Sequence, residues 1–132
     1  MNLVGTKRVV ELCKELKNLK AFVHVSTAYA NCDRTTINEE VYKPPIEPNK
    51  LIEMLDLIDD NLANYISPIV IKPKPNTYTY TKAIAESLVV QECGNGPNGA
   101  HLPTCIVRPS IITASWREPF PGWIGKYNSN RN

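Results

Sequence analysis

Residues 75–90 read PNTYTYTKAIAESLVV, a run that joins a helix start, two tyrosines, a lysine and an apolar stripe. Proline restricts the residue before it, and Asn76 or Thr77 can then cap the first turn of a helix. No proline or glycine interrupts residues 77–90. We therefore predict a helix from residue 77 to about residue 90, and this helix carries the most informative side chains of the chain.

Two of these side chains share one face of the predicted helix. Tyr78 and Lys82 are four residues apart, so about one turn separates them. A lysine cation beside a phenol favours the ionised phenol, whose unperturbed pKa near ~10 is otherwise too high for proton transfer at neutral pH. Tyr80 instead shares its spacing with Ile84 and Leu88, which is typical of a core stripe. Tyr78 is therefore the candidate proton donor, and Tyr80 is expected to pack in the core.

Two apolar runs on either side of this helix are expected to be strands. Residues 21–25 read AFVHV and residues 104–108 read TCIVR, and their nearly continuous apolar character indicates strands buried on both faces of a parallel sheet. A helical pattern over residues 2–19 precedes the first run. The order helix, strand, insertion, helix, strand predicts an α/β fold that contains part of a doubly wound parallel sheet.

Polar residues follow each predicted strand at its carboxyl end, the edge where open α/β sheets bind ligands. Ser26 and Thr27 follow the first strand, and either hydroxyl could act with the phenol on a carbonyl oxygen while hydride arrives. We favour Thr27 over Ser26; the simpler alternative is that they cap a turn. Arg108 and Pro109 end the second strand and are expected to lie beside a nicotinamide, or simply to terminate the strand. Together these residues predict a nicotinamide-dependent carbonyl reductase.

Between the strands, residues 33–75 form a polar insertion marked by prolines. The apolar spacing over residues 51–66 predicts one or two amphipathic helices within it. Residues 94–99 read GNGPNG and satisfy the dinucleotide-binding pattern G-x-G-x-x-G literally. That motif must follow a strand and open a helix, whereas this run follows a helix and precedes a strand. We therefore expect residues 94–99 to be an ordinary loop.

Composition excludes several functional classes. The formal net charge is +2, and no basic run supports a nucleic-acid partner. The 4 cysteines form no Cys-x-x-Cys pair, so we expect no metal site. No signal peptide precedes them, so we expect reduced thiols in a cytosol-facing compartment. No apolar run approaches the ~18 to 20 residues of a membrane span. The sequence therefore predicts a globular, metal-free domain.

Three sequence blocks carry a resemblance to a known family. They are HVSTAYAN at 24–31, PNTYTYTKAIAE at 75–86, and IVRPSII at 106–112, the last leading to EPFPGW at 118–123. The chain resembles the fatty acyl-CoA reductases, the alcohol-forming branch of the extended short-chain dehydrogenase/reductase superfamily. The match runs from residue 2 to about residue 128, and the blocks occur in the family's order.

The resemblance implies NADPH as hydride donor and a long-chain fatty acyl-CoA as substrate, reduced through an aldehyde to a primary alcohol. Tyr78 matches the catalytic tyrosine, and Lys82 matches the lysine that assists it and holds the nicotinamide ribose. Thr27, or its neighbour Ser26, matches the hydroxyl that polarises the thioester carbonyl. Asn2 lies where related reductases carry an asparagine that supports the water network of the lysine.

The resemblance also sets expectations for the whole chain. Residues 1–132 would be the central part of an NAD(P)-binding, Rossmann-like reductase domain, with the helical insertion at about 33–75. The family's amino-terminal phosphate-binding βα unit would be missing, as would the region after residue 128. Family members associate with the peroxisomal or endoplasmic reticulum membrane. The alternatives are a catalytically inactive truncated fragment and another extended short-chain reductase, for example one acting on a sugar nucleotide, which the block at 118–123 disfavours.

Overall fold

The structure is a computed structural model that describes residues 2–94 and 102–124. The predicted loop at 94–99 lies outside these residues, apart from Gly94, which ends a helix. The elements follow in the order α1 (Asn2–Glu15), β1 (Phe22–Val25), the 3-10 helix η1 (Ala28–Asn31), α2 (Pro48–Asp56), α3 (Asp60–Val70), α4 (Thr77–Gly94) and β2 (Thr104–Val107). The predicted order of helix, strand, insertion, helix and strand is confirmed.

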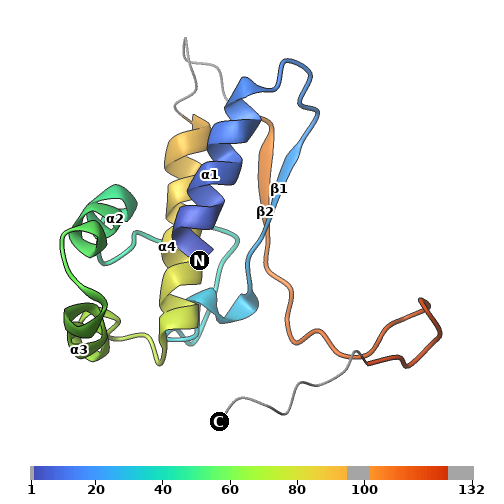
Figure 1. Cartoon of the computed structure of the whole chain (residues 1–132). Helices are drawn as coiled ribbons and strands as arrows, with labels where there is room; N and C mark the ends of the chain where they lie inside the picture. Colours follow the sequence, from blue (N-terminus) through green and yellow to red (C-terminus); the bar gives the residue numbers. More distant parts are fainter. Residues whose placement is uncertain (1, 95–101, 125–132) are drawn as a thin grey trace.

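The two strands pair in parallel, with Phe22 opposite Thr104 and Val25 opposite Val107. The helices α1 and α4 lie side by side along one face of this sheet (Figure 1). The chain reaches β2 from β1 through the insertion and α4, which is the kind of crossover that parallel strands require. The mixed α/β architecture and the parallel pairing are confirmed. The described residues form a two-stranded sheet, so they do not test the expected doubly wound sheet.

Only one face of the sheet is covered by the described helices. His24 points towards α1 and α4 and is buried, whereas its neighbours Val23 and Val25 are 50% and 55% exposed. Successive side chains of a strand point to opposite faces, so helices on one side leave every second residue open. The expectation that this strand is buried on both faces is therefore wrong for the part of the protein that the structure describes.

The core is built on α4. Tyr80, Ile84 and Leu88 pack with Leu3 of α1 and Leu51 of α2, and Tyr80 is only 3% exposed. Residues four apart on a helix share one face, so the stripe recognised in the sequence becomes the packing surface. The prediction that Tyr80 is a core residue is confirmed.

The long helices begin where the sequence predicts, but their C-terminal ends differ from the prediction. Asn76 caps α4, because its Oδ1 accepts a hydrogen bond from the backbone N–H of Thr79 (2.9 Å). α4 continues past Val90 to Gly94, since Cys93 extends its buried stripe. The helix expected over residues 2–19 stops earlier, at Glu15, where the chain turns to enter β1. Boundaries of this kind depend on the following element more than on local propensity.

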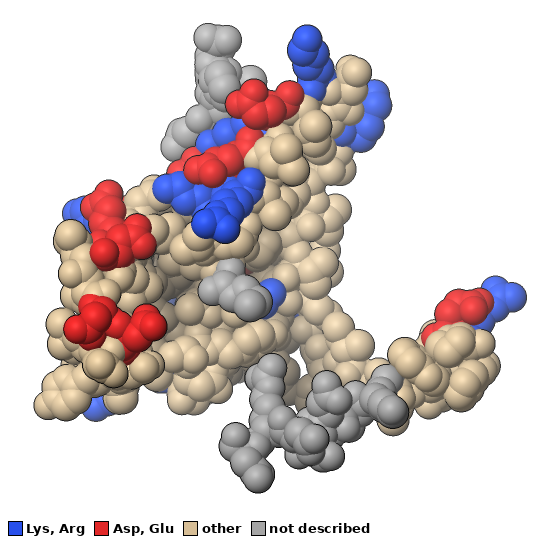
Figure 2. Space-filling view, in the orientation of Figure 1, with Lys and Arg blue, Asp and Glu red and all other residues tan. Residues whose placement is uncertain are grey.

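The insertion forms two short helices on the side of α4 away from the sheet (Figure 1). Glu47 caps α2 by accepting hydrogen bonds from two backbone N–H groups. Asp59 caps α3 by accepting one hydrogen bond from the backbone N–H of Leu62 (2.8 Å). α3 contains no buried residue. Acidic side chains gather over this part of the surface (Figure 2), and Asp56 and Asp60 are exposed there. These carboxylates form a solvated helix surface.

Candidate active site

The first turns of α4 bring the tyrosine–lysine pair to the end of β1. Lys82 donates a hydrogen bond from Nζ to the carbonyl oxygen of Val25, the last residue of that strand (3.0 Å). Tyr78, one turn earlier on the same helix face, is 49% exposed. The lysine is therefore fixed at the carboxyl edge of the sheet, while the phenol remains accessible to a ligand.

The two hydroxyl residues lie directly beyond this strand. Ser26 and Thr27 are buried, and the parallel ladder continues through them, with Ser26 N–H bonded to Val107 O (2.8 Å) and Ala28 N–H bonded to Pro109 O (2.9 Å). Ser26 Oγ has no partner among the described residues. Since Ser26 belongs to the extended strand pair, its hydroxyl position is set by the sheet and does not depend on a mobile loop.

Thr27 has a structural role as well. Its Oγ1 accepts a hydrogen bond from Tyr29 N–H (3.2 Å) and caps η1, and η1 packs against α4. The capping role considered for this pair is therefore confirmed for Thr27. Capping uses an acceptor lone pair of the hydroxyl and leaves its proton available for donation to a ligand. Ser26 and Thr27 thus both keep a donor at the edge of the sheet.

Asn2 joins the site from α1. Its Nδ2 donates to Thr81 Oγ1 (3.2 Å), the residue next to Lys82. A groove of about 280 Å³ lies between the start of α1 and β1, lined among others by Asn2, Thr6, His24, Val25 and Lys82. Of the candidate residues, Asn2 and Lys82 line this groove, whereas Arg108 lines a separate and larger cavity.

His24 lies under this groove. A histidine inside an apolar strand is usually a core residue with satisfied hydrogen bonds, but here the buried His24 has no partner for Nε2 among the described residues. Burial lowers the pKa of His24, and the Lys82 cation lowers it further, against a smaller opposite effect of Glu86. The neutral imidazole is therefore the stable form at this position.

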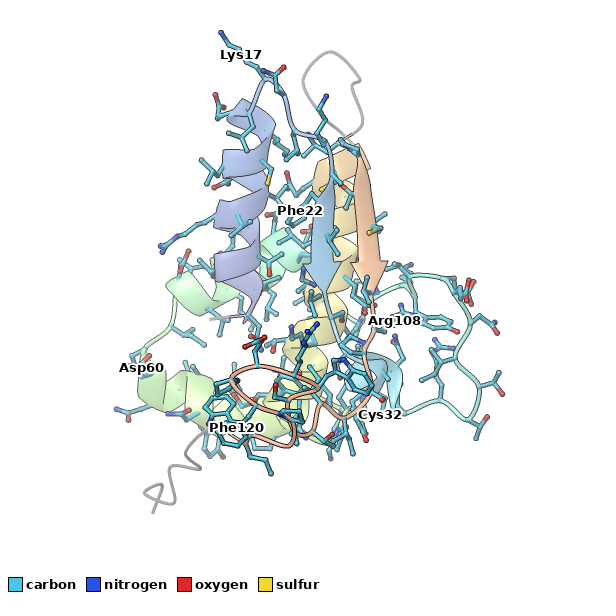
Figure 3. The ribbon with its side chains drawn as sticks, turned by 90° about the vertical axis from the view of Figure 1, so that its right-hand side faces the viewer. Lys17, Phe22, Cys32, Asp60, Arg108 and Phe120 are labelled. Carbon is cyan, nitrogen blue, oxygen red and sulfur yellow. The ribbon has the colours of Figure 1, made fainter. Side chains whose placement is uncertain are left out.

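Arg108 is placed against α4 and the insertion. Its guanidinium donates to both carboxylate oxygens of Glu86 (Nε at 2.9 Å and Nη2 at 2.7 Å). It also donates to the carbonyl oxygens of Asn38 (3.1 Å) and Glu40 (2.7 Å). The hydrogen bonds that Arg108 donates to Glu86 raise the pKa of Arg108, with burial working in the opposite direction. Figure 3 shows Arg108 just past the ends of β1 and β2, so it shares the carboxyl edge with the other candidates.

Two functional-site neighbours were missed by sequence reasoning. Glu86 is 1% exposed, and a carboxylate inside an apolar helix stripe is a signal that a cationic partner must exist. Lys74 is 8% exposed and donates from Nζ to Ala30 O (2.7 Å) and to Asp33. Nothing in the local sequence distinguishes Lys74 from a surface lysine, because its partners lie more than 40 positions earlier in the chain.

Other possibilities find no support in the described part of the chain. Aromatic residues after β2 could line an acyl channel, but Trp116 is 91% exposed and the segment runs away from the body of the molecule (Figure 1). No group of three or more potential metal ligands occurs in residues 2–94 and 102–124. Within the same residues, no helix has the length and apolar character needed to cross a bilayer.

The tyrosine–lysine pair of α4, the two hydroxyl residues after β1 and Asn2, bonded to the neighbour of Lys82, therefore lie near the carboxyl edge of the sheet. The family model described as "Male sterility protein", an NAD-binding family, matches residues 1–131. The chain belongs to this family, and this membership supports a nicotinamide cofactor.

Curated relatives agree with this assignment. The chain is 53% identical to "Fatty acyl-CoA reductase 1" of Xenopus laevis and 52% identical to the protein of the same name from Homo sapiens, in each case over 128 residues. It is 43% identical to "Fatty acyl-CoA reductase 2" of Mus musculus over the same length. These matches cover 97% of this chain and 24% of each relative, so the chain spans about a quarter of their length. No solved structure matches the chain.

Proposed function

We propose that this chain forms the catalytic edge of an NADPH-dependent fatty acyl-CoA reductase that converts a long-chain acyl-CoA to a primary alcohol through an aldehyde. The observation that carries the proposal is the hydrogen bond from Lys82 Nζ to Val25 O, which joins the tyrosine–lysine helix to the strand that leads into Ser26 and Thr27. The 52% to 53% identity to proteins named fatty acyl-CoA reductase 1 supports the substrate class.

In this proposal, the hydroxyl of Thr27, or of Ser26, and the phenol of Tyr78 hydrogen-bond the thioester carbonyl. Hydride addition to that carbonyl creates an oxyanion, and donors already fixed at its position stabilise the transition state. Collapse of the oxyanion breaks the C–S bond, which gives the aldehyde and releases CoA, whose thiolate takes up one proton. Tyr78 supplies a proton in the second reduction, when the aldehyde oxygen becomes the alcohol hydroxyl. Its exposure is compatible with this role, because the acid must touch the substrate.

NADPH, when bound, supplies one hydride for each of the two reductions, and each reduction also takes up one proton. The residues present fit such a cofactor. One of the three N–H donors of Lys82 is used by Val25 O, which leaves two for the neighbouring hydroxyls of a ribose. Asn2 is held next to Lys82 through Thr81 and can support water molecules around the ammonium group. The groove of about 280 Å³ gives these groups access to a ligand.

The proposal extends to the compartment. Four thiols free of disulfides, Cys13, Cys32, Cys93 and Cys105, agree with a cytosol-facing protein. We place the reaction on the cytosolic side of a peroxisomal or endoplasmic reticulum membrane. Fractionation of cells that express the tagged protein tests this placement, and recovery from the secretory lumen would contradict it.

The test of the activity uses two proteins. One is the 132-residue chain, and the other is the Xenopus laevis reductase with its 128 aligned residues replaced by those of this chain. NADPH oxidation is followed with palmitoyl-CoA as substrate. We expect Tyr78→Phe to lower kcat by at least about 100-fold, since a positioned acid contributes ~100 to 10,000-fold. NADH in place of NADPH should support a lower rate.

Tyr80→Phe is the matched control, because it removes a phenol hydroxyl from the core two residues away. The Tyr80 hydroxyl has no partner among the described residues, so its loss should leave the rate close to that of the unmodified protein. An unchanged rate for Tyr78→Phe would show that the acid is assigned wrongly. Absence of NADPH oxidation in the hybrid reductase would contradict the proposed function.

A further inference from the structure

An exposed segment without regular secondary structure follows η1. Residues 33–42 contain no helix or strand, and residues 33–40 are all exposed. Such segments normally stay in place only when specific contacts offset their conformational entropy. Here the contacts come from two cations that belong to other parts of the fold, Lys74 and Arg108.

Lys74 holds the beginning of the segment. Its buried ammonium donates to the carbonyl oxygen of Ala30 and to the carboxylate of Asp33. Burial alone would raise the pKa of Asp33, but the hydrogen bond from Lys74 and the nearby positive charges lower it below its usual value. Both ends of the insertion therefore meet at this ion pair, directly before α4 begins at Thr77.

Arg108 holds the middle of the segment. It uses one side of its guanidinium on Glu86 and the remaining donors on the carbonyl oxygens of Asn38 and Glu40. Only a guanidinium presents enough donors, in a planar fork, to satisfy a carboxylate and two carbonyls together. Glu86 lies one helical turn after Lys82, so the segment is fixed to the same helix that carries the candidate catalytic pair.

Contacts inside the segment complete its shape. The guanidinium of Arg34 lies over the ring of Tyr42, 3.8 Å from the ring centre. The hydroxyl of Tyr42 accepts a hydrogen bond from the backbone N–H of Asn38 (2.8 Å). The segment therefore contacts two cations from other parts of the fold, Lys74 and Arg108. Within the segment, the Tyr42 ring joins Arg34 to Asn38.

The position of the segment relates it to the site. Residues 37–41, Ala28 and Arg108 line one cavity of about 830 Å³. The same cavity continues along α4 and β2, where Val89, Cys93 and Leu102 line it. Ala28, which follows Thr27 in the chain, lines it at the carboxyl end of the strands. The apolar side chains of Ile37 and Val41 contribute to its lining, as expected for a wall that meets a lipid-like substrate.

We propose that residues 33–42 form a fixed, specificity-determining wall of the acyl-CoA site, with Lys74 and Arg108 as the positioning residues that hold it. This inference rests on the proposed function for the identity of the substrate. In this proposal the acyl chain lies in the cavity of about 830 Å³, which Ala28 joins to Thr27 and the thioester carbonyl. Lys74 and Arg108 act through the wall and do not touch the reacting atoms.

The test measures amide hydrogen exchange and palmitoyl-CoA binding in the 132-residue chain. Arg108→Lys keeps a positive charge next to Glu86 but loses the fork, and Lys74→Gln removes the ion pair with Asp33. In both variants we expect exchange within residues 33–42 to become about tenfold faster, because hydrogen bonds to charged groups are lost. We expect the Kd for palmitoyl-CoA to rise about tenfold as the wall loosens.

Arg8→Lys is the control, since it makes the same chemical change on the exposed surface of α1. It should alter neither measurement. Unchanged exchange in Arg108→Lys and Lys74→Gln would overturn the role of the two cations. Faster exchange with an unchanged Kd would overturn the role of the segment in substrate binding. If the unmodified chain binds no palmitoyl-CoA, the proposed function and the wall both fail, while the exchange result still decides whether the cations hold the segment.

Discussion

At the scale of single residues, the buried charges of this protein are grouped around the candidate site. Glu86 and Arg108 form an ion pair in which the carboxylate is 1% exposed. Removing one partner of such a pair costs about 3 to 5 kcal/mol, because the other charge stays buried without compensation. Truncation of Arg108 to alanine would leave the Glu86 charge buried without a partner and could unfold the protein. Arg108→Lys keeps a positive charge beside Glu86 and is therefore the more informative variant.

The buried imidazole of His24 predicts a pH dependence of stability. Its pKa is lowered by burial and by Lys82, so in the folded protein it resists a proton that the unfolded chain accepts below about pH 6.5. Its contribution to folding free energy is complete above that pH and is lost as the pH falls towards the lowered folded-state pKa. We expect the thermal midpoint to fall between about pH 7 and about pH 5.5.

His24→Gln isolates this effect, because glutamine does not titrate. The variant should lose most of the pH dependence in that range when unfolding is followed by circular dichroism. The carboxylates with lowered pKa values, Asp33, Glu47 and Glu92, contribute stability that is lost only as the pH falls below about 4. An identical slope in the variant and the unmodified protein would show that His24 does not control it.

Residue roles were predictable where the signal is local. Tyr78 is four residues from Lys82, whereas Tyr80 is four residues from Ile84, so helix spacing distinguishes the two tyrosines. The structure confirms the burial of Tyr80. The partners of Glu86 and Lys74 could not be predicted, because they lie 22 and 41 positions away in the chain. No local pattern encodes such distances, since they depend on how the strands and the insertion fold back onto α4.

At the scale of elements, the buried residues show which helices are stabilised by tertiary packing. α4 is buried along nearly its whole length, whereas α3 contains no buried residue among its 11. A helix of this length is marginal in water by itself. The stability of α3 must therefore depend strongly on its ends, and its amides should exchange faster than those of α4.

Asp59 is the residue that tests this dependence. Its carboxylate accepts a hydrogen bond from Leu62 N–H (2.8 Å) and caps α3. We expect Asp59→Ala to destabilise α3 locally by about 1 kcal/mol. Amide exchange should accelerate within α3 and remain unchanged in α4.

Asp60→Ala is the matched control, because Asp60 lies in the first turn of α3 without being its cap. It removes only a favourable interaction with the helix dipole and should have the smaller effect. Equal acceleration in the two variants would contradict the capping role of Asp59.

The elements themselves were largely predictable. Apolar runs, helix spacing and the order of segments predicted both strands and all the longer helices. The burial of the strands on two faces was predicted wrongly, because a continuous apolar run does not show which face is covered in a given part of a protein. Helix ends such as Glu15 and Gly94 depend on where the next element begins, and this depends on tertiary packing.

At the scale of the whole molecule, the arrangement separates the four cysteines into two classes. Cys13 and Cys93 are buried between α1, α4 and the sheet, whereas Cys32 and Cys105 are exposed. Cys105 lies on the open face of the sheet, opposite the helices. This distribution offers a direct test of whether the 132-residue chain adopts the fold.

With a thiol reagent such as Ellman's reagent, we expect Cys32 and Cys105 to react quickly. Cys13 and Cys93 should react at least about 100-fold more slowly, because the reagent reaches them only after local opening of the core. The modified positions are identified by mass spectrometry of peptides. Uniform fast reaction of all four thiols in the absence of denaturant would contradict the arrangement, and adding denaturant provides the control for full reactivity.

The strand register has a consequence for how the protein is made. Phe22 of β1 pairs with Thr104, a residue 82 positions later in the chain. At about 5 to 20 residues per second, a ribosome needs roughly 4 to 16 s to add those residues. During this interval, β1 is complete but has no β2 to pair with, while the insertion and α4 are still being synthesised. Nascent chains of this protein therefore expose an apolar strand whose pairing partner has not yet been synthesised. We expect β1 to be a binding segment for chaperones during translation.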